Sequence, residues 1–114
     1  MVIIKFEDII AWQKAGKLTY LIYEKFNKCK DFGFKNQMER ASVSIMNNIA
    51  EGFERKTNNE FKQFLYIAKG SCGEARSMLY LGLKLNYLSS SEFEIFYDLS
   101  EEISKCLSGL IKTL

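Results

Sequence analysis

Residues suited to nucleic-acid chemistry recur at helical spacing in the third apolar-periodic segment of the chain. Successive members are three or four positions apart, so on a helix they fall within a narrow arc. Cations in such an arc can contact successive phosphates, and tyrosines can stack on bases or sugars. This set, which we call the basic stripe, consists of Lys62, Tyr66, Lys69, Gly73, Arg76, Tyr80 and Lys84.

The first helical segment carries a weaker run of the same kind, interrupted by Leu21. Its members are Lys14, Lys17, Lys25 and Lys28. We predict that the basic stripe, together with Lys14 and Lys17, binds nucleic acid, with RNA as the expected polymer. A solvated bundle face with tyrosines half-buried at its edge has the same spacing, and this interpretation stays open.

A polar row lies beside the apolar positions of the second helical segment, at Arg40, Ser44, Asn48 and Glu51. The spacing of three and four places its members on one helix face. Because an unpaired polar group close to a core costs about 1–3 kcal/mol, we interpret the row as a hydrogen-bond network that fixes helix register or a subunit contact. Contact with a ligand or nucleic acid is the alternative.

The composition argues against most catalytic and metal chemistry. The 114 residues include no histidine, which removes the commonest general base and the usual zinc ligand. Cys29, Cys72 and Cys106 form no CxxC pair, so a disulfide framework and a zinc site are both disfavoured. We therefore expect a reducing cytoplasm, no enzyme activity, no catalytic residue, no metal and no cofactor.

The beginning of the chain lacks the pattern of a signal peptide, and no apolar run approaches the roughly 18 residues that a membrane span needs. We expect no membrane partner. Charge is unevenly distributed: residues 1–90 hold 14 Lys or Arg against 9 Asp or Glu, whereas residues 91–114 hold 2 against 5. The acidic side chains near the C-terminus either face solvent or meet the basic residues, within a subunit or between subunits.

Apolar periodicity and the absence of proline predict helices over about 8–27, 34–54, 58–86 and 90–113. Asp8 is the expected N-cap of the first helix, and Asn27 to Gly33 is the expected loop after it. Thr57–Glu60 and Ser89–Glu92 have the spacing of capping boxes. The short connections favour a single all-α domain, residues 1–114, folded as an antiparallel up-down four-helix bundle.

The apolar positions predict one core-facing row on each helix. For the first helix this row is Ile9, Trp12, Gly16, Thr19, Tyr23 and Phe26, and for the last it is Phe96, Leu99, Ile103, Cys106, Leu110 and Leu114. Several apolar residues fall outside these rows, and self-association into a homo-oligomer would bury them. They are Leu18, Leu21, Ile22, Ile67, Met78 and Leu81.

Several stretches carry a family resemblance. They are residues 6–15 (FEDIIAWQKA), 37–45 (QMERASVSI), 48–53 (NIAEGF), 55–56, 64–71 (FLYIAKGS), 74, 87–88 and 109–111. Together they resemble the small bacterial "four helix bundle protein" family, whose members are also called 23S rRNA intervening-sequence proteins. The resemblance covers essentially the whole chain, and where the family often has a proline after Ser-Ile this chain has Met46.

The resemblance implies an up-down four-helix bundle and a homopentamer. Genes of the family lie within intervening sequences of 23S rRNA genes or elsewhere in bacterial genomes. The accessory variability protein of diversity-generating retroelements is similar in fold and works with a reverse transcriptase and nucleic acid. We therefore expect a non-catalytic nucleic-acid-binding homo-oligomer, with a protein-interaction scaffold that holds a partner protein as the alternative.

Overall fold

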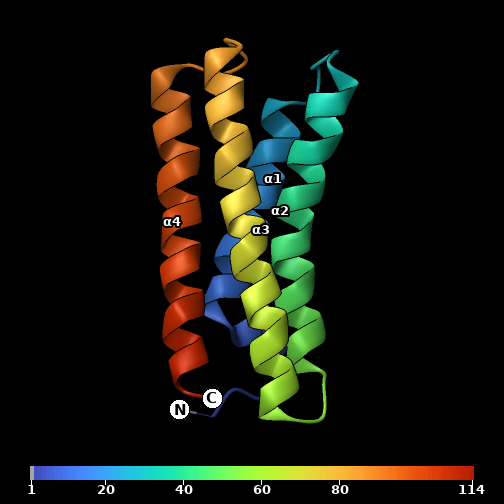
Figure 1. The fold of residues 1–114 in the computed structure, drawn as a ribbon, viewed down its shortest axis with the longest axis vertical. Coiled ribbons are helices and arrows are strands. Elements are labelled where there is room, and N and C mark those ends of the chain that lie inside the picture. Colours follow the sequence, from blue (N-terminus) through green and yellow to red (C-terminus); the bar gives the residue numbers. More distant parts are fainter. Residues whose placement is uncertain (1) are drawn as a thin grey trace.

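The computed structural model describes residues 2–114, which form four long helices in a bundle of 42 × 22 × 19 Å. A 3-10 turn precedes the helices. The elements are η1 (Phe6–Asp8), α1 (Ile10–Lys25), α2 (Phe32–Phe53), α3 (Asn58–Lys84) and α4 (Ser90–Lys112). Successive helices run in opposite directions, and both termini lie at the end of the bundle where α2 turns into α3 (Figure 1). The all-α up-down bundle is therefore confirmed.

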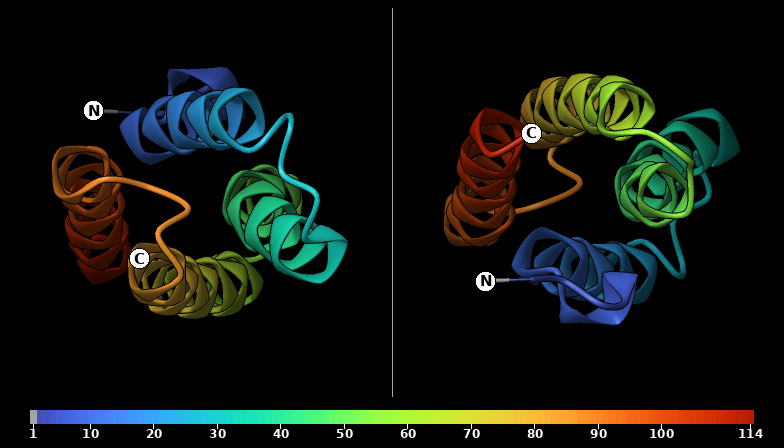
Figure 2. Two further views of the ribbon diagram at one scale, coloured as in Figure 1. Left: turned by 90° about the horizontal axis from the view of Figure 1, so that it is seen from above. Right: turned by 90° about the horizontal axis from the view of Figure 1, so that it is seen from below.

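The four helices stand at the corners of a square around one core (Figure 2). α1 and α3 occupy opposite corners, so each of them packs against both α2 and α4. Each helix turns one row of apolar side chains inward, which is the arrangement expected for an up-down bundle. Within residues 2–114, no helix combines the length and the apolar character required to cross a membrane.

The buried face of α1 is rotated from the predicted one. Leu18 and Ile22, which we expected outside the core, are fully buried together with Ala11 and Ala15. Tyr23, which we expected to face inward, is 46% exposed. Both faces have helical spacing, so periodicity alone did not distinguish them. The observed face places two alanines inward, and their small side chains let neighbouring helices approach α1.

The buried row of α4 agrees with the prediction only as far as Ile103. Beyond it the core continues through Leu107 and Ile111, while Cys106 and Leu110 lie at the core's edge. The two rows separate at Ile103, because the predicted row takes a step of three to Cys106 whereas the buried row takes steps of four to Leu107 and Ile111. A helix has 3.6 residues per turn, so both steps are compatible with one apolar face and spacing alone does not choose between them.

The helix ends follow local capping chemistry, with two departures from the prediction. Ser89 and Glu92 form the expected capping box. Thr57 caps α3 as expected, but the Glu60 carboxylate accepts a hydrogen bond from the Thr57 hydroxyl, at 3.1 Å, instead of from its backbone N–H. Asp8 does not cap α1, because it lies in η1 and Ile9 occupies the N-cap position.

The two loops at the other end of the bundle are tied together by Asp31. One carboxylate oxygen of Asp31 accepts the N–H of Phe34, which caps α2, and the other accepts the Tyr87 hydroxyl at 2.7 Å. Because Asp31 caps the helix, α2 begins at Phe32, inside the segment predicted as loop. Asn86 has φ of 62° and ends α3 in a Schellman motif, two residues before the predicted end.

Two glycines allow α2 and α3 to pack closely. A Cβ at Gly52 would lie 2.6 Å from the Cβ of Phe64, and one at Gly82 would lie within 3 Å of both Phe34 and Leu88. Real side chains do not tolerate such distances, so these positions require glycine. Gly70, in contrast, has no neighbouring atom within 4 Å of where its Cβ would be, so packing within the described chain does not explain it.

Alanine at these glycines therefore has opposite predicted effects. Gly52→Ala should lower the free energy of unfolding by about 1–3 kcal/mol, because the new methyl group overpacks the α2–α3 contact. Gly70→Ala should raise it by up to about 1 kcal/mol, because alanine is the better helix former and meets no obstacle. Denaturant unfolding of the two variants checks this, and a stable Gly52→Ala protein would contradict the close approach.

Candidate nucleic-acid interface

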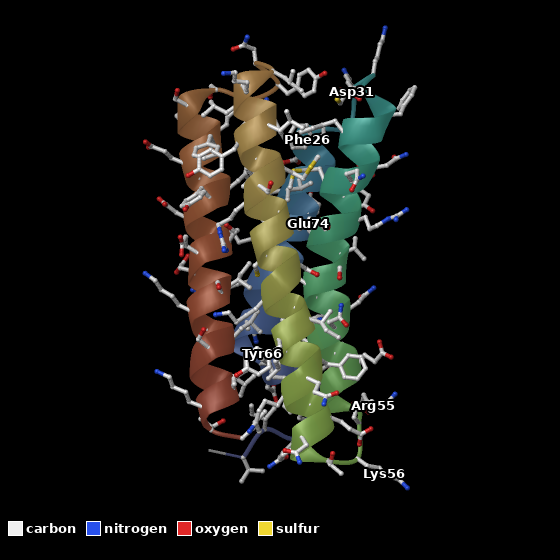
Figure 3. All side chains as sticks on the ribbon, viewed as in Figure 1. Phe26, Asp31, Arg55, Lys56, Tyr66 and Glu74 are labelled. Atoms are coloured by element: carbon white, nitrogen blue, oxygen red, sulfur yellow. The ribbon has the colours of Figure 1, made fainter. Side chains whose placement is uncertain are left out.

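The basic stripe borders α4 rather than facing solvent on the outside of α3. The Nζ atom of Lys69 donates to the Ser108 hydroxyl of α4 at 2.6 Å. The ring of Tyr80 lies 5.0 Å from that of Phe93, also on α4. Tyr66, which is 58% exposed, lies on the side of α3 next to α4 (Figure 3). The stripe therefore follows the seam between α3 and α4, which we call the α3–α4 seam.

Arg76 has a hydrogen-bonding group that the protein does not use. Its Nη1 atom is buried and has no hydrogen-bond partner within residues 2–114. Its Nη2 atom lies 3.9 Å from where a Cβ of Gly73 would be, so the guanidinium extends back along α3 over a position without a side chain. A buried N–H without an acceptor is unfavourable, so Arg76 has a donor available for a ligand.

An aromatic cluster of Tyr80, Phe93 and Tyr97 forms the part of the seam nearest the α3–α4 loop. Phe93 and Tyr97 stack at 5.4 Å with an interplanar angle of 29°, and the Tyr80 ring meets Tyr97 edge-on at 5.8 Å. Tyr80 nevertheless remains 55% exposed. Interactions of the Tyr97 hydroxyl with Tyr80 and then Glu101 raise the pKa of Tyr97, so it stays protonated at neutral pH.

The cations of the basic stripe keep their charge uncompensated. The ion pairs found within residues 2–114 involve Lys14, Lys25 and Arg55. None of them includes Lys62, Lys69, Arg76 or Lys84. The acceptor of Lys69 is a neutral hydroxyl, which orients the ammonium group without cancelling its charge. The stripe cations therefore have no ion-pair partner within the described chain, although the Glu101 carboxylate of α4 lies beside Tyr97 in the seam.

The cations of α1 behave differently, because the acidic residues of α4 pair with them. Lys14 Nζ lies 2.7 Å from Glu102, and Lys25 Nζ lies 2.8 Å from Glu92. The hydrogen bond from Lys14 lowers the pKa of Glu102, and the reverse effect raises the pKa of Lys14. Lys17 is exposed and forms no such pair within residues 2–114, although its charge also lowers the pKa of Glu102.

Two of the four residues in the polar row of α2, Ser44 and Asn48, belong to a hydrogen-bond network. The Asn48 amide donates to the Ser44 backbone carbonyl at 2.8 Å and to its hydroxyl at 3.0 Å. The Ser44 hydroxyl in turn lies 2.8 Å from that of Ser71 on α3, so the pair links the two helices. Arg40 and Glu51 are exposed and take no part in these bonds.

The residues of α4 that complete the seam were not predicted from the sequence. Phe93 and Tyr97 are four positions apart, which places two aromatic rings on one helix face. Ser100 follows Tyr97 by three positions, and Ser104 and Ser108 follow in steps of four. The aromatic pair and the serines were visible in the sequence, but nothing in it indicated that Ser108 contacts Lys69 or that the two rings pack on Tyr80.

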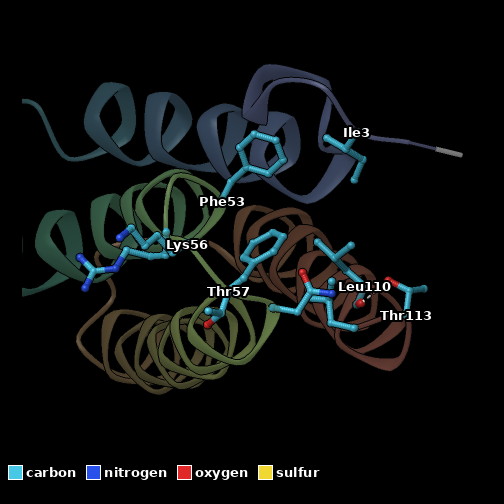
Figure 4. A pocket seen from close by; sticks show the side chains of 10 residues that line it. Ile3, Phe53, Lys56, Thr57, Leu110 and Thr113 are labelled. Atoms are coloured by element: carbon cyan, nitrogen blue, oxygen red, sulfur yellow. Dashed lines mark hydrogen bonds between the residues drawn. The ribbon is translucent and has the colours of Figure 1, made fainter.

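A cavity of about 330 Å³ lies at the opposite end of the bundle from Asp31, beneath the α2–α3 loop. Phe53 and Ile3 face Leu110 and Thr113 across it (Figure 4). Arg55 at its rim is engaged by Glu60 at 3.4 Å and by the ring of Phe64. Lys56 and Asn58 also line the cavity. No set of three metal-ligating side chains comes together within residues 2–114.

Comparison with known protein families identifies the family of this chain. The profile described as 23S rRNA-intervening sequence protein matches residues 7–109, which begin within η1 and include α1, α2, α3 and all but the end of α4. The chain belongs to the 23S rRNA-intervening sequence protein family. The matched region includes the whole basic stripe and the polar row of α2.

A solved structure from the same group of proteins has a very similar fold. It is a protein of unknown function from the S23 ribosomal protein family of Bacteroides thetaiotaomicron, with 27% sequence identity and a TM-score of 0.84. The match covers 90% of this chain and 99% of the other. A comparison with curated proteins finds no match. The family and the fold of this 23S rRNA-intervening sequence protein are thus established.

The ion pair between α1 and α4 predicts a pH dependence. The hydrogen bond from Lys25, followed by that from the backbone of Ser89, lowers the pKa of Glu92 from its ordinary 4.5. A carboxylate with a depressed folded-state pKa stabilises the protein above its unfolded-state pKa, and that stabilisation disappears as pH falls through the folded value. Stability should therefore decline as pH falls below about 4.5.

The variant Glu92→Gln tests this, because glutamine keeps the capping-box acceptor and loses the charge. It should be less stable than the native protein at neutral pH, and the difference should shrink as pH falls below 4.5. Denaturant unfolding at several pH values measures it. Glu94→Gln, an exposed change on the same helix, is the control. A difference that stays constant with pH would contradict the assignment.

Proposed function

We propose that this 23S rRNA-intervening sequence protein is a non-catalytic nucleic-acid-binding protein that acts as a homo-oligomeric ring in the bacterial cytoplasm, with RNA as its expected polymer. The basic stripe forms the interface. Lys62, Lys69, Arg76 and Lys84 contact phosphates, and Tyr66 and Tyr80 supply stacking surfaces. Lys17 adds a further cation on α1. Three free cysteines are compatible with a reducing compartment.

The observation that carries this proposal is the contrast between the two sides of α4. On the side of α1, Glu92 and Glu102 cancel the charge of Lys25 and Lys14. On the side of α3, α4 presents the neutral Ser108 hydroxyl to Lys69, and Glu101 lies beside Tyr97, but within residues 2–114 no carboxylate forms an ion pair with the stripe. A solvated face built only for solubility gains nothing from this separation, whereas a phosphate-binding surface requires it.

The proposal predicts a salt-dependent interaction that depends on the seam. Fluorescence anisotropy with a labelled RNA at low and moderate salt should show binding that weakens steeply as salt rises. Lys69→Gln/Arg76→Gln should reduce the affinity. It should also lower the slope of log K against log salt by about 1.4 for a single strand, since each phosphate contact contributes about 0.7.

Lys5→Gln/Lys105→Gln is the matched control, because both side chains are exposed and outside the seam. It removes the same charge, so a purely global charge effect would lower the affinity equally. Circular dichroism of each variant establishes that it is folded. Absence of binding to RNA and to duplex DNA at low salt, by folded native protein, would overturn the proposal.

Self-association is supported by surfaces that packing within the described chain does not explain. Gly109 lies inside α4 with open space at its Cβ position, although glycine there costs up to about 1 kcal/mol relative to alanine. Ile10 and Ile95 are 57% and 61% exposed. An apolar hollow of about 340 Å³ adjoins Ile10 and Gly109. A second copy that approaches closely at this hollow would account for Ile10 and Gly109 together.

The expected solution state is an assembly of several 13.2 kDa chains, with a pentamer as the family-based expectation. Light scattering after size exclusion measures the mass across a concentration series. Ile10→Lys should shift the mass toward the monomer, because it introduces a charge beside the hollow, whereas Tyr20→Lys, which changes another exposed side chain of α1, should not. A native protein that stays monomeric at every concentration would contradict self-association.

The same apolar hollow supports the alternative function, a scaffold that holds a partner protein without touching nucleic acid. In that case the interface would use Ile10 and the adjoining hollow rather than the basic stripe. A stoichiometric protein partner retained after nuclease treatment, by a chain that binds no RNA, would favour this alternative.

A further inference from the structure

We propose that the α3–α4 seam is a site for single-stranded nucleic acid, which holds a phosphate at Lys69 and Arg76 and stacks the adjacent base on the aromatic cluster. The inference rests on the proposed function and deepens it, because it names the strand form and the place of each contact. The chemistry recognised is an unpaired base next to a phosphodiester, which RNA and DNA strands share. The experiment distinguishes these two sources.

Lys69 and Arg76 are the two cations that would contact the phosphate. Lys69 and Arg76 are seven residues apart, two turns of α3, which corresponds to a rise of about 10 Å. Lys69 is already oriented toward the seam by its hydrogen bond to Ser108. Arg76 has a buried Nη1 without a partner, so a turn of its guanidinium toward a phosphate oxygen satisfies a donor that the protein leaves unused.

Gly73 leaves the space between the two cations open. A Cβ at this position would meet nothing within 4 Å except the Nη2 atom of Arg76. A larger side chain here would stand between Lys69 and Arg76, on the path of a backbone that contacts both. Gly73 would therefore act as glycines do in phosphate-binding sites, because the missing side chain lets the ligand approach the helix closely.

The aromatic cluster would contact the base. Its member on α3, Tyr80, follows Arg76 by one helical turn. Tyr80 is 55% exposed, and Phe93 and Tyr97 support its ring at 5.0 and 5.8 Å. A ring held in place by two others loses little freedom when a base stacks on it, which favours binding. The order along α3 is thus cation, open glycine, cation and aromatic surface, which places the stacking surface one turn beyond the phosphate contacts.

This arrangement favours a single strand over a duplex. Bases in a duplex are stacked on one another, so a protein ring reaches only bases that are unpaired and turned outward. Lys69 and Arg76 are partly buried beside α4, instead of extending outward to a broad surface. A flexible single strand can enter such a seam. The backbone of a nucleic-acid duplex is rigid, so it contacts cations that project outward from the protein.

The experiment compares the affinity of the native chain for four labelled probes of one sequence. They are RNA and DNA strands of about 12 nucleotides and their two duplexes. Both single strands should bind more tightly than their duplexes. Tyr80→Ala should weaken single-strand binding about 5- to 150-fold, which corresponds to the loss of one stacked base, and should leave duplex binding unchanged.

Three further variants separate stacking from packing. Tyr80→Phe keeps a ring and should bind like the native protein. Tyr80→Leu keeps an apolar side chain against Phe93 but cannot stack in the same way, so it should bind as weakly as Tyr80→Ala. Tyr20→Ala removes an exposed tyrosine of α1, outside the seam, and should have no effect. Thermal unfolding of each variant confirms that it is folded under the assay conditions.

The outcomes distinguish this inference from the proposed function. Duplexes that bind as tightly as single strands, with Tyr80→Ala equal to Tyr20→Ala, would overturn the single-strand site and leave nucleic-acid binding intact. Folded protein that binds none of the four probes would overturn both. Preferential binding of single strands that depends on Tyr80 supports the site, and the RNA-to-DNA ratio identifies the polymer.

Discussion

The close contact of α2 with α3 is the constraint on which the rest of this bundle depends. Gly52 and Gly82 lie near opposite ends of the pair and admit Phe64 at one end and Phe34 with Leu88 at the other. Contacts this close leave little freedom to rotate either helix about its axis. The Ser44–Ser71 hydrogen bond between them fixes the same register from the polar side.

That constraint determines where the cations of α3 lie. With Phe61, Leu65 and Ala68 directed into the core, the positions one step around the helix necessarily reach α4. Lys69 and Arg76 thus border Cys72, whose burial raises the pKa of its thiol to about 12 despite the two positive charges beside it. The charge of the seam follows from how α3 is held by α2.

α4 presents different kinds of side chain to its two neighbouring helices, α1 and α3. Its carboxylates at Glu92 and Glu102 lie toward α1 and neutralise lysines, while its aromatic rings and Ser108 lie toward α3. The acidic C-terminal region is therefore not a general counterweight to the basic body of the chain. Glu92 and Glu102 pair with Lys25 and Lys14 of α1, whereas Glu101, beside Tyr97 on the side of α3, forms no ion pair with the basic stripe within residues 2–114.

The sequence by itself determined the number of helices, most of their ends and the family. These depend on neighbours within a few residues, such as the Ser89–Glu92 capping box, or on apolar spacing along one helix. It also identified the members of the basic stripe. Where the sequence failed, as with Leu18 and Ile22, two faces of one helix satisfied the same spacing.

Only the tertiary structure decided which face of α1 is buried, which cations are paired and what lies opposite the stripe. Each of these depends on contacts between residues far apart in the chain, such as Lys14 with Glu102 or Lys69 with Ser108. Helical periodicity gives the direction of a side chain relative to its own helix. It contains no information about the rotation of one helix against another, which the packing of small residues at the helix contacts determines.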